Sequence, residues 1–152
     1  MAAVTVSIES PRQLEVVRLV EELDAYLTGL YPAESNHLLD IETLARPDIC
    51  FLVVRRDGEA LGCGALRVDA SGYGEVKRIY VPPRVRGLGL GRELMAALEA
   101  EARRRGLTCL RLETGIHQPE ALGLFRAAGF GDIAAFGDYA PDPLSVFMEK
   151  AL

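Results

Sequence analysis

The sequence Arg84-Val85-Arg86-Gly87-Leu88-Gly89-Leu90-Gly91 stands between a strand-like segment, 76–81, and a long amphipathic pattern with helical spacing. Its three glycines allow sharp backbone turns because they carry no Cβ atom. The first N–H groups of a helix have no partner within that helix, so a helix that begins here presents donors to an anion. The arginines of the stretch, together with Arg92, carry guanidinium groups that suit phosphate oxygens. The stretch therefore predicts a phosphate-binding loop that opens a helix.

The composition is that of one globular domain, which we expect to span residues 1–152. A chain of this length can bury roughly two thirds of its unfolded surface in one core. Hydrophobic residues make up 49% of the sequence, yet no apolar run approaches the roughly 20 residues of a membrane span. The net charge of -5 argues against nucleic-acid binding, which needs a basic balance. The sequence thus predicts neither nucleic acid nor a membrane as a partner.

The N-terminal residues indicate the location of the protein, and the cysteines and histidines indicate whether it binds a metal. Residues 1–7 lack the basic start and the long apolar centre of a signal peptide, so we expect a cytoplasmic protein. Cys50, Cys63 and Cys109 each lie in an apolar, strand-like segment and not in a metal-type pair, which favours buried thiols. Because the two histidines, His37 and His117, do not have a metal-ligand spacing, we expect no metal site.

Before the loop, the pattern predicts a strand, two helices and an antiparallel meander. Ser10-Pro11-Arg12-Gln13 matches a helix start with a serine cap and proline at the first helical position. Apolar residues then recur at helical spacing as far as Leu30. Asp57-Gly58 is typical of a hairpin turn. The predicted segments are strands at 4–9, 51–54, 60–68 and 73–81, and helices at 11–30 and 40–45.

After the loop, helices and strands alternate. The helix that begins at Leu90 ends at Gly106, and the strand that follows it should run parallel to strand 73–81 because a crossover helix joins them. Pro119 begins a further helix and Gly129 ends it. The predicted segments are helices at 90–105 and 119–128, and strands at 109–113, 130–136 and 145–148. The fold class is therefore α+β, a mixed and mainly antiparallel sheet of about six to seven strands flanked by about four helices.

Two other nucleotide-binding patterns fit the glycine loop poorly. A P-loop needs a Lys-Ser or Lys-Thr pair after its glycines, and none follows here. A dinucleotide fingerprint needs Gly-x-Gly-x-x-Gly directly after the strand, whereas residues 82–86 intervene and Arg92 stands at the third glycine. Glu113 at the end of the next strand is its one supporting feature.

What fits is Arg86-x-x-Gly89-x-Gly91, preceded by Tyr80-Val81-x-Pro83 and followed by Gln118-x-x-Ala121-x-x-Leu124-Phe125-x-x-x-Gly129-Phe130. This pair of motifs closely resembles the GCN5-related N-acetyltransferase (GNAT) family over about residues 51–130. Ala33-Glu34-Ser35 and Leu112-Glu113-Thr114-Gly115 are further similar to one bacterial subfamily of small-molecule acetyltransferases.

The resemblance implies acetyl-CoA as cosubstrate, with its pyrophosphate on the N–H groups of residues 86–91. The pantetheine arm would pair with the backbone of residues 79–81, where a splay from strand 109–113 opens a slot for the thioester. The N–H near Val81 would then polarise the thioester carbonyl, an effect of about 3 kcal/mol. The implied cofactor-binding residues are Ile79, Tyr80, Val81, Arg86, Gly87, Leu88, Gly89, Leu90, Gly91, Arg92, Gln118 and Phe125.

Acetyl transfer to an amine requires a base, because a free alkylamine with a pKa of roughly 10 is mostly protonated at neutral pH. Glu75 matches the position where some family members carry a carboxylate base. Lys77 falls on the same face of that strand, and a close pairing would lower the basicity of the carboxylate. Glu75 is thus either the general base or one partner of an ion pair. That ion pair would stabilise the fold or orient the substrate.

The thiolate of CoA, which leaves when the acetyl group is transferred, can take a proton from an acidic side chain of the enzyme. Many relatives use a tyrosine where this chain has Phe125, which cannot donate a proton. Tyr139 or Tyr80 could serve instead, or the thiolate could leave unprotonated, since a thiol pKa of roughly 8.5 makes it a fair leaving group. Gln118 replaces an asparagine of the second motif, and its amide could contact the pantetheine or cap the helix.

The expected function is N-acetyl transfer from acetyl-CoA to a primary amine of a small molecule, by direct attack in a ternary complex. Two other classes stay open, a non-catalytic CoA-binding module and a dinucleotide-dependent oxidoreductase. Lys77 and Arg78 beside Glu75 allow an acceptor that also carries a carboxylate. The oligomeric state stays open, with a homodimer among the choices. The residues expected around the acceptor are Glu34, Ser35, His37, Lys77, Arg78, Glu113 and Thr114.

Overall fold

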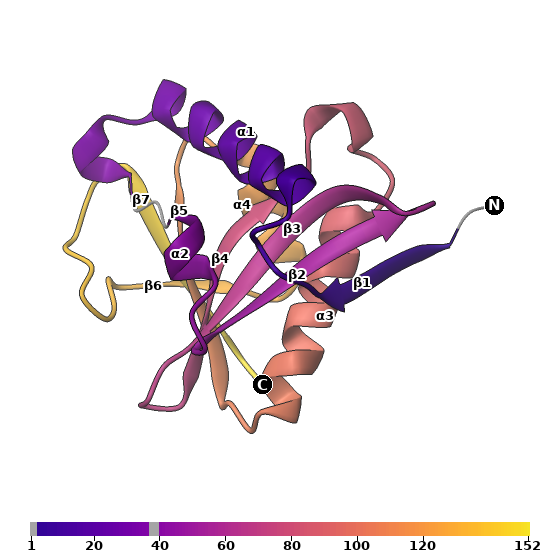
Figure 1. Ribbon diagram of the computed structural model, residues 1–152. Coiled ribbons are helices and arrows are strands. Elements are labelled where there is room, and N and C mark those ends of the chain that lie inside the picture. The colour runs from indigo at the N-terminus through magenta and orange to yellow at the C-terminus, as the bar shows by residue number, and fades with distance from the viewer. Residues whose placement is uncertain (1–2, 37–39) are drawn as a thin grey trace.

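The computed structural model describes residues 3–36 and 40–152, and His37 lies outside the described residues. Figure 1 shows helices on both sides of one twisted sheet. The strands are β1 Val4–Ile8, β2 Ile49–Arg56, β3 Glu59–Val68, β4 Tyr73–Tyr80, β5 Cys109–Gly115, β6 Gly131–Ile133 and β7 Ser145–Ala151. The helices are α1 Leu14–Leu30, α2 Ile41–Leu44, α3 Leu90–Arg104 and α4 Pro119–Ala127, with short 3-10 turns η1 Ala33–Ser35 and η2 Pro83–Val85.

The seven strands form one sheet in the order β1-β2-β3-β4-β5-β7-β6. Every neighbouring pair is antiparallel except β4 and β5, which run parallel. The parallel pair arises because α3 carries the chain back along the sheet between the two strands. The predicted α+β class, the meander and the parallel strand are confirmed.

The sheet is buried on both faces, and successive residues of β2 show this. Leu52 and Val54 pack in the same cluster as Leu94 and Leu98 of α3. Phe51 and Val53 point the other way, into a cluster with the inner face of α1. The continuous apolar run of β2 is therefore explained by a helix on each side, as Figure 1 shows for α1 and α3.

The predicted start of the first helix is wrong by three residues. The Ser10 hydroxyl accepts the Arg12 N–H at 3.1 Å and closes a turn, so it does not cap the helix. Gln13 precedes the first helical residue with an extended backbone, φ -64° and ψ 137°. Serine followed by proline thus forms a separate turn here, and α1 begins at Leu14.

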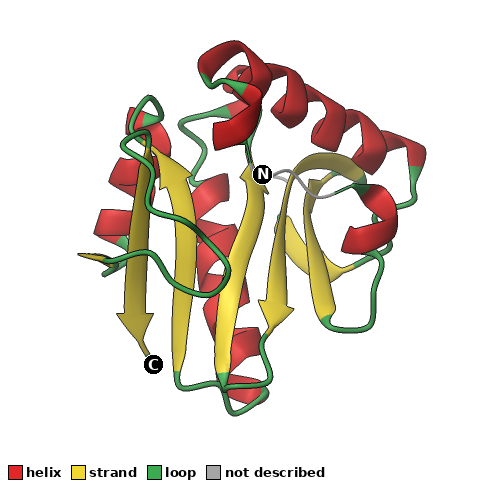
Figure 2. Cartoon of the chain, turned by 90° about the vertical axis from the view of Figure 1, so that its left-hand side faces the viewer, coloured by secondary structure: helices red, strands yellow, loops and turns green. Residues whose placement is uncertain are grey.

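The last strands also differ from the prediction. β6 covers only three of the seven residues expected at 130–136, because its pairing with β7 ends at Ile133 opposite Phe147. Phe136 instead packs edge-on against Tyr73 and Phe147, with ring centroids 5.8 and 5.9 Å away. The segment 134–144 therefore leaves the sheet plane and crosses one face of the sheet (Figure 2).

The cysteines are free thiols. Cys50 and Cys63 are buried, as predicted, whereas Cys109 is half-buried because it lies beside the crossing segment 134–144 and not under a helix.

The parallel pair β4 and β5 separates before either strand ends. Its register runs from Tyr73 opposite Cys109 to Val76 opposite Leu112 and stops there, although β4 continues for four more residues. A bulge accompanies the separation, since the β3–β4 register shifts at this point and Arg78 has a positive φ of 58°. The splay expected between these strands is confirmed, and it divides the sheet at its centre.

One pH-dependent contribution to stability lies beside β1. The Glu9 carboxylate accepts bonds from Arg55 Nε at 3.0 Å and Nη2 at 2.9 Å, which lower the pKa of Glu9 from 4.5 to about 2. A lowered pKa stabilises the fold above the unfolded value, so this contribution is lost as the pH falls from 4.5 toward 2. With screening by solvent, we expect about 1 kcal/mol.

Urea unfolding of wild type and Glu9→Gln measures this contribution. The two proteins should differ in free energy of unfolding by about 1 kcal/mol at pH 7, and the difference should shrink toward pH 2. A difference that stays constant with pH would show that the glutamine variant lost packing and not charge.

Candidate active site

The glycine loop places backbone N–H donors ahead of the helical hydrogen-bond ladder at the start of α3. Gly87 and Gly89 adopt left-handed conformations, with φ of 84° and 77°. The first intrahelical bond runs from the Glu93 N–H to the Gly89 carbonyl at 3.1 Å, so the N–H groups of residues 90–92 precede the helical ladder. The donors of this helix start therefore form an anion-binding cradle.

The cradle is part of a cavity of about 760 Å³. Its walls include the strand end Ile79–Tyr80–Val81, the loop and α4, and this volume suits a ligand of cofactor size. Arg86 Nε donates to the Val81 carbonyl at 3.2 Å and so ties the loop to the end of β4. Of the expected cofactor residues in the described structure, ten line this cavity, namely Ile79, Tyr80, Val81, Arg86, Gly87, Gly89, Leu90, Gly91, Arg92 and Gln118.

Leu88 and Phe125 do not line this cavity in the part of the chain that the structure describes. Leu88 is 48% exposed at the tip of the loop. Phe125 is buried against Phe130 and faces a second, smaller cavity.

The smaller cavity, of about 100 Å³, lies at the split between β4 and β5, where residues 76–79 and 112–115 line it. Its walls come from α1, η1, β4, β5, α4 and the segment 134–144. Four residues line both cavities, Leu23, Ile79, Gln118 and Ala121. The two cavities therefore meet where the sheet divides.

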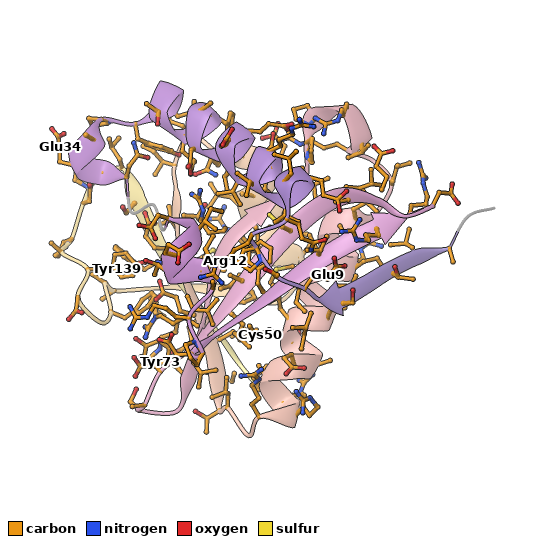
Figure 3. The ribbon with its side chains drawn as sticks, viewed as in Figure 1. Glu9, Arg12, Glu34, Cys50, Tyr73 and Tyr139 are labelled. Carbon is orange, nitrogen blue, oxygen red and sulfur yellow. The ribbon has the colours of Figure 1, made fainter. Side chains whose placement is uncertain are left out.

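Most residues expected around the acceptor lie at the smaller cavity. Ser35, Lys77, Arg78, Glu113, Thr114 and Tyr139 line it. Glu34 is exposed at the periphery, as Figure 3 shows, and among the described residues neither it nor Glu75 lines the cavity. Sequence reasoning missed Tyr31, Asn36 and Leu144, because an aromatic, an amide and a leucine in loops carry no motif that distinguishes them.

Glu75 is buried at the centre of a polar network. One carboxylate oxygen accepts Arg67 Nη2 at 3.1 Å and the other accepts Lys77 Nζ at 3.1 Å. The Tyr139 hydroxyl also donates to this second oxygen, while Lys77 Nζ donates to the tyrosine oxygen at 2.7 Å. The ion pair of Glu75 and Lys77 predicted as one alternative is present, with a second cation that the sequence did not indicate.

Burial and the neighbouring Glu75 carboxylate raise the pKa of Tyr139. Its hydroxyl therefore stays protonated at neutral pH and holds the segment 134–144 against β4. Figure 3 shows Tyr139 on the same side of the molecule as Tyr73.

Arg78 lies at the bulge with its side chain turned toward α1. Its Nη2 donates to Asp24 and lies 3.5 Å from the Val20 carbonyl. Among the described residues its Nε and Nη1 have no hydrogen-bond partner. The guanidinium is therefore held under α1, while the residue as a whole borders the smaller cavity.

Glu113 differs from Glu75 in its surroundings. The Ser145 hydroxyl donates to its carboxylate at 2.8 Å. Burial raises the pKa of Glu113 to about 7, an effect that the Ser145 bond and the charge of Lys77 oppose. This carboxyl group changes its protonation near neutral pH.

Tyr31 joins α1 to the start of α4. Its hydroxyl donates to Gln118 Oε1 at 3.2 Å and accepts the His117 N–H at 3.0 Å. Within the described structure the Gln118 side chain makes no bond to the α4 backbone, so the helix cap, one of the two alternatives for this residue, is not formed. The same side chain lines both cavities.

Within residues 3–36 and 40–152, none of the helices combines the length and the apolar character of a membrane-spanning segment. The same residues hold no group of three or more potential metal-ligating side chains.

Comparison with known proteins agrees with this geometry. The family model "Acetyltransferase (GNAT) family" matches residues 16–130. A protein of Azospirillum brasilense, named IAA acetyltransferase, is 58% identical over the full length of both chains. A solved structure from Klebsiella pneumoniae, described as a candidate acyl-CoA N-acyltransferase, is 43% identical with a TM-score of 0.84 and covers 98% of this chain and 97% of its own.

A PaiA N-acetyltransferase from Thermoplasma acidophilum, solved in complex with coenzyme A, shares the fold at 19% identity, with a TM-score of 0.76 and 99% coverage of both chains. These relatives favour acetyl transfer over the two other classes that the sequence left open. The cavities, the motifs and the relatives together show that the chain belongs to the acetyltransferase (GNAT) family and is an acetyl-CoA-dependent enzyme.

Proposed function

We propose that this enzyme transfers the acetyl group of acetyl-CoA to a primary amine of a small molecule, with both substrates bound at once. The observation that carries the proposal is the meeting of the two cavities at the split between β4 and β5. A cosubstrate in the larger cavity and an acceptor in the smaller one would contact each other at that point. Direct attack then needs no covalent enzyme intermediate.

The residues present fit acetyl-CoA. The N–H groups at the start of α3, with Arg86 and Arg92, suit its pyrophosphate, and the free end of β4 suits its pantetheine arm. When bound, acetyl-CoA supplies an activated acetyl thioester. The Val81 N–H is our candidate for polarising the thioester carbonyl.

The Glu75 network supports an orienting role for that residue. Arg67 and Lys77 both form ion pairs with its carboxylate, so both of its oxygens are already engaged by side chains of the protein. Glu75 thereby holds Lys77 and Tyr139 at the wall of the smaller cavity. Of the two roles open for Glu75, we assign it the ion pair.

The departing thiol does not require an acid from the enzyme. Phe125 carries no proton to give, and the Tyr139 proton is donated to Glu75. A thiol with a pKa of roughly 8.5 leaves readily as the thiolate. We therefore assign no general acid.

A small acceptor is favoured by the size of the smaller cavity, about 100 Å³. The name of the Azospirillum brasilense relative also points to a small molecule. The acceptor panel therefore consists of small primary amines, namely amino acids, polyamines and arylalkylamines.

Two measurements test the proposal. Acetyl-CoA and CoA should raise the melting temperature, whereas NAD should not. Acetyl-CoA with one class of small primary amine should release free thiol at a rate proportional to enzyme concentration. Thiol release only with peptide amines, or with no amine, would contradict the small-molecule acceptor.

A further inference from the structure

Glu113 lies at the point where the sheet divides. It follows Leu112, the last residue of β5 that pairs with β4. Leu110 and Leu112 point into the core beneath α3, so Glu113, one residue further, points to the opposite face. That is the face of the smaller cavity, which Glu113 lines.

The carboxylate of Glu113 has capacity to accept a proton from a ligand. Among the described residues it forms no ion pair, and its one hydrogen bond comes from Ser145 Oγ at 2.8 Å. Glu75, by contrast, accepts from an arginine, a lysine and a tyrosine, and does not line the cavity. Of these two neighbouring carboxylates, Glu113 is the one that an acceptor amine can reach.

The charged and titratable groups around Glu113 come from every element packed against it. Lys77 and Glu75 lie on β4, Asp142 and Tyr139 in the segment 134–144, and Tyr31 at the end of α1. Lys77 favours the ionised form of Glu113, while Glu75 and Asp142 oppose it together with burial. The balance leaves the carboxyl ready to exchange a proton near neutral pH, which is what general-base catalysis needs.

We propose that Glu113 is the general base of this enzyme, a role that rests on the proposed transfer to a primary amine. Its carboxylate takes one proton from the acceptor ammonium and becomes a carboxylic acid. The freed nitrogen lone pair forms the bond to the acetyl carbon, while the carbon–sulfur bond breaks and its electron pair stays on sulfur. The second nitrogen proton leaves to the thiolate or to water, so that atoms and charges balance. Ser145 is a positioning residue that directs the carboxylate through its hydroxyl bond.

The test is the pH dependence of kcat/KM with an amine that the wild-type enzyme acetylates. Wild type should lose activity below about pH 7, as Glu113 becomes protonated. Glu113→Gln should lower kcat/KM by about 100-fold or more, and the remaining rate should lack this acidic limb. Glu113→Asp should keep the limb at a reduced rate.

Two further variants separate chemistry from folding. Ser145→Ala removes a hydrogen bond that favours the ionised carboxylate, so its acidic limb should move to higher pH. Glu149 lies on the neighbouring strand β7, its carboxylate pairs with Arg111, and among the described residues it borders neither cavity. The Glu149→Gln variant should therefore keep the wild-type pH profile. Acetyl-CoA should still raise the melting temperature of all these variants.

An acidic limb that is unchanged in both Glu113→Gln and Ser145→Ala would overturn the assignment of Glu113 as the base. The proposed function would still stand in that case, because the wild-type enzyme turns over an amine. If wild type released thiol with none of the amines, the proposed function would fall and this role with it. The two failures are therefore distinguishable in one set of measurements.

Discussion

Replacing Gly89 with alanine should weaken the binding of acetyl-CoA about tenfold. Gly89 has φ of 77°, in the left-handed region, directly before the first residue of α3. A side chain in this conformation costs roughly 1–2 kcal/mol. A loop that relaxes to avoid this cost turns its N–H groups away from the anion site, and 1.4 kcal/mol corresponds to about a factor of ten in the dissociation constant.

Gly58→Ala is the matched control. Gly58 has the same φ of 77°, and an added Cβ meets no atom within 4 Å at either position. It lies in the hairpin turn between β2 and β3, outside both cavities as described. Calorimetric titration should therefore show wild-type affinity for acetyl-CoA in Gly58→Ala, although its stability falls. Wild-type affinity in Gly89→Ala would contradict the loop as the pyrophosphate site.

Replacing Gly115 with alanine should destabilise the fold and disturb the acceptor cavity together. A Cβ at this position would lie 1.9 Å from the Tyr31 hydroxyl oxygen and 2.2 Å from Cζ, so the ring must move. Tyr31 then loses its bonds to Gln118 and to the His117 N–H. Overpacking and the two lost bonds together should lower the free energy of unfolding by about 3 kcal/mol.

Denaturant unfolding with a second-site change tests this explanation. Adding Tyr31→Ala to Gly115→Ala makes room for the new methyl group, so the double variant should cost less than the sum of the two single ones. Gly29→Ala is the control, because its Cβ meets nothing within 4 Å on the exposed side of α1, and it should stabilise the helix by up to about 1 kcal/mol. Strict additivity of the two changes would show that Tyr31 does not oppose the substitution.

The features of the fold that depend on local sequence patterns were predicted correctly. The sharp turns at the loop glycines, the hairpin turn at Asp57-Gly58, the parallel strand after α3 and the end of α3 just before Gly106 follow from residue type and spacing. The misplaced start of α1 has a local cause too, since Ser10 can close a turn as readily as it caps a helix. Local signals of this kind compete at the ends of helices.

The candidate site could be predicted only in part, because its polar groups meet through tertiary structure. Tyr139 reaches Glu75 from 64 positions further along the chain, and no spacing rule connects them. Glu113 shares the smaller cavity with residues of the segment 134–144, which the sequence indicated only as a loop rich in glycine, aspartate and proline. Lys77 could be paired with Glu75 in advance because two residues on one strand share a face.

The early separation of β4 from β5 gives this sheet two additional edges in its interior. An open strand edge normally invites pairing with a strand of another molecule, which leads to aggregation. Here the interior edges are recessed between α1 and α4, whose residues line the walls of both cavities. A ligand that lies in either cavity can therefore reach backbone hydrogen-bonding groups that the neighbouring strand does not occupy. The sheet thus offers edges for recognition at its centre and not at its periphery.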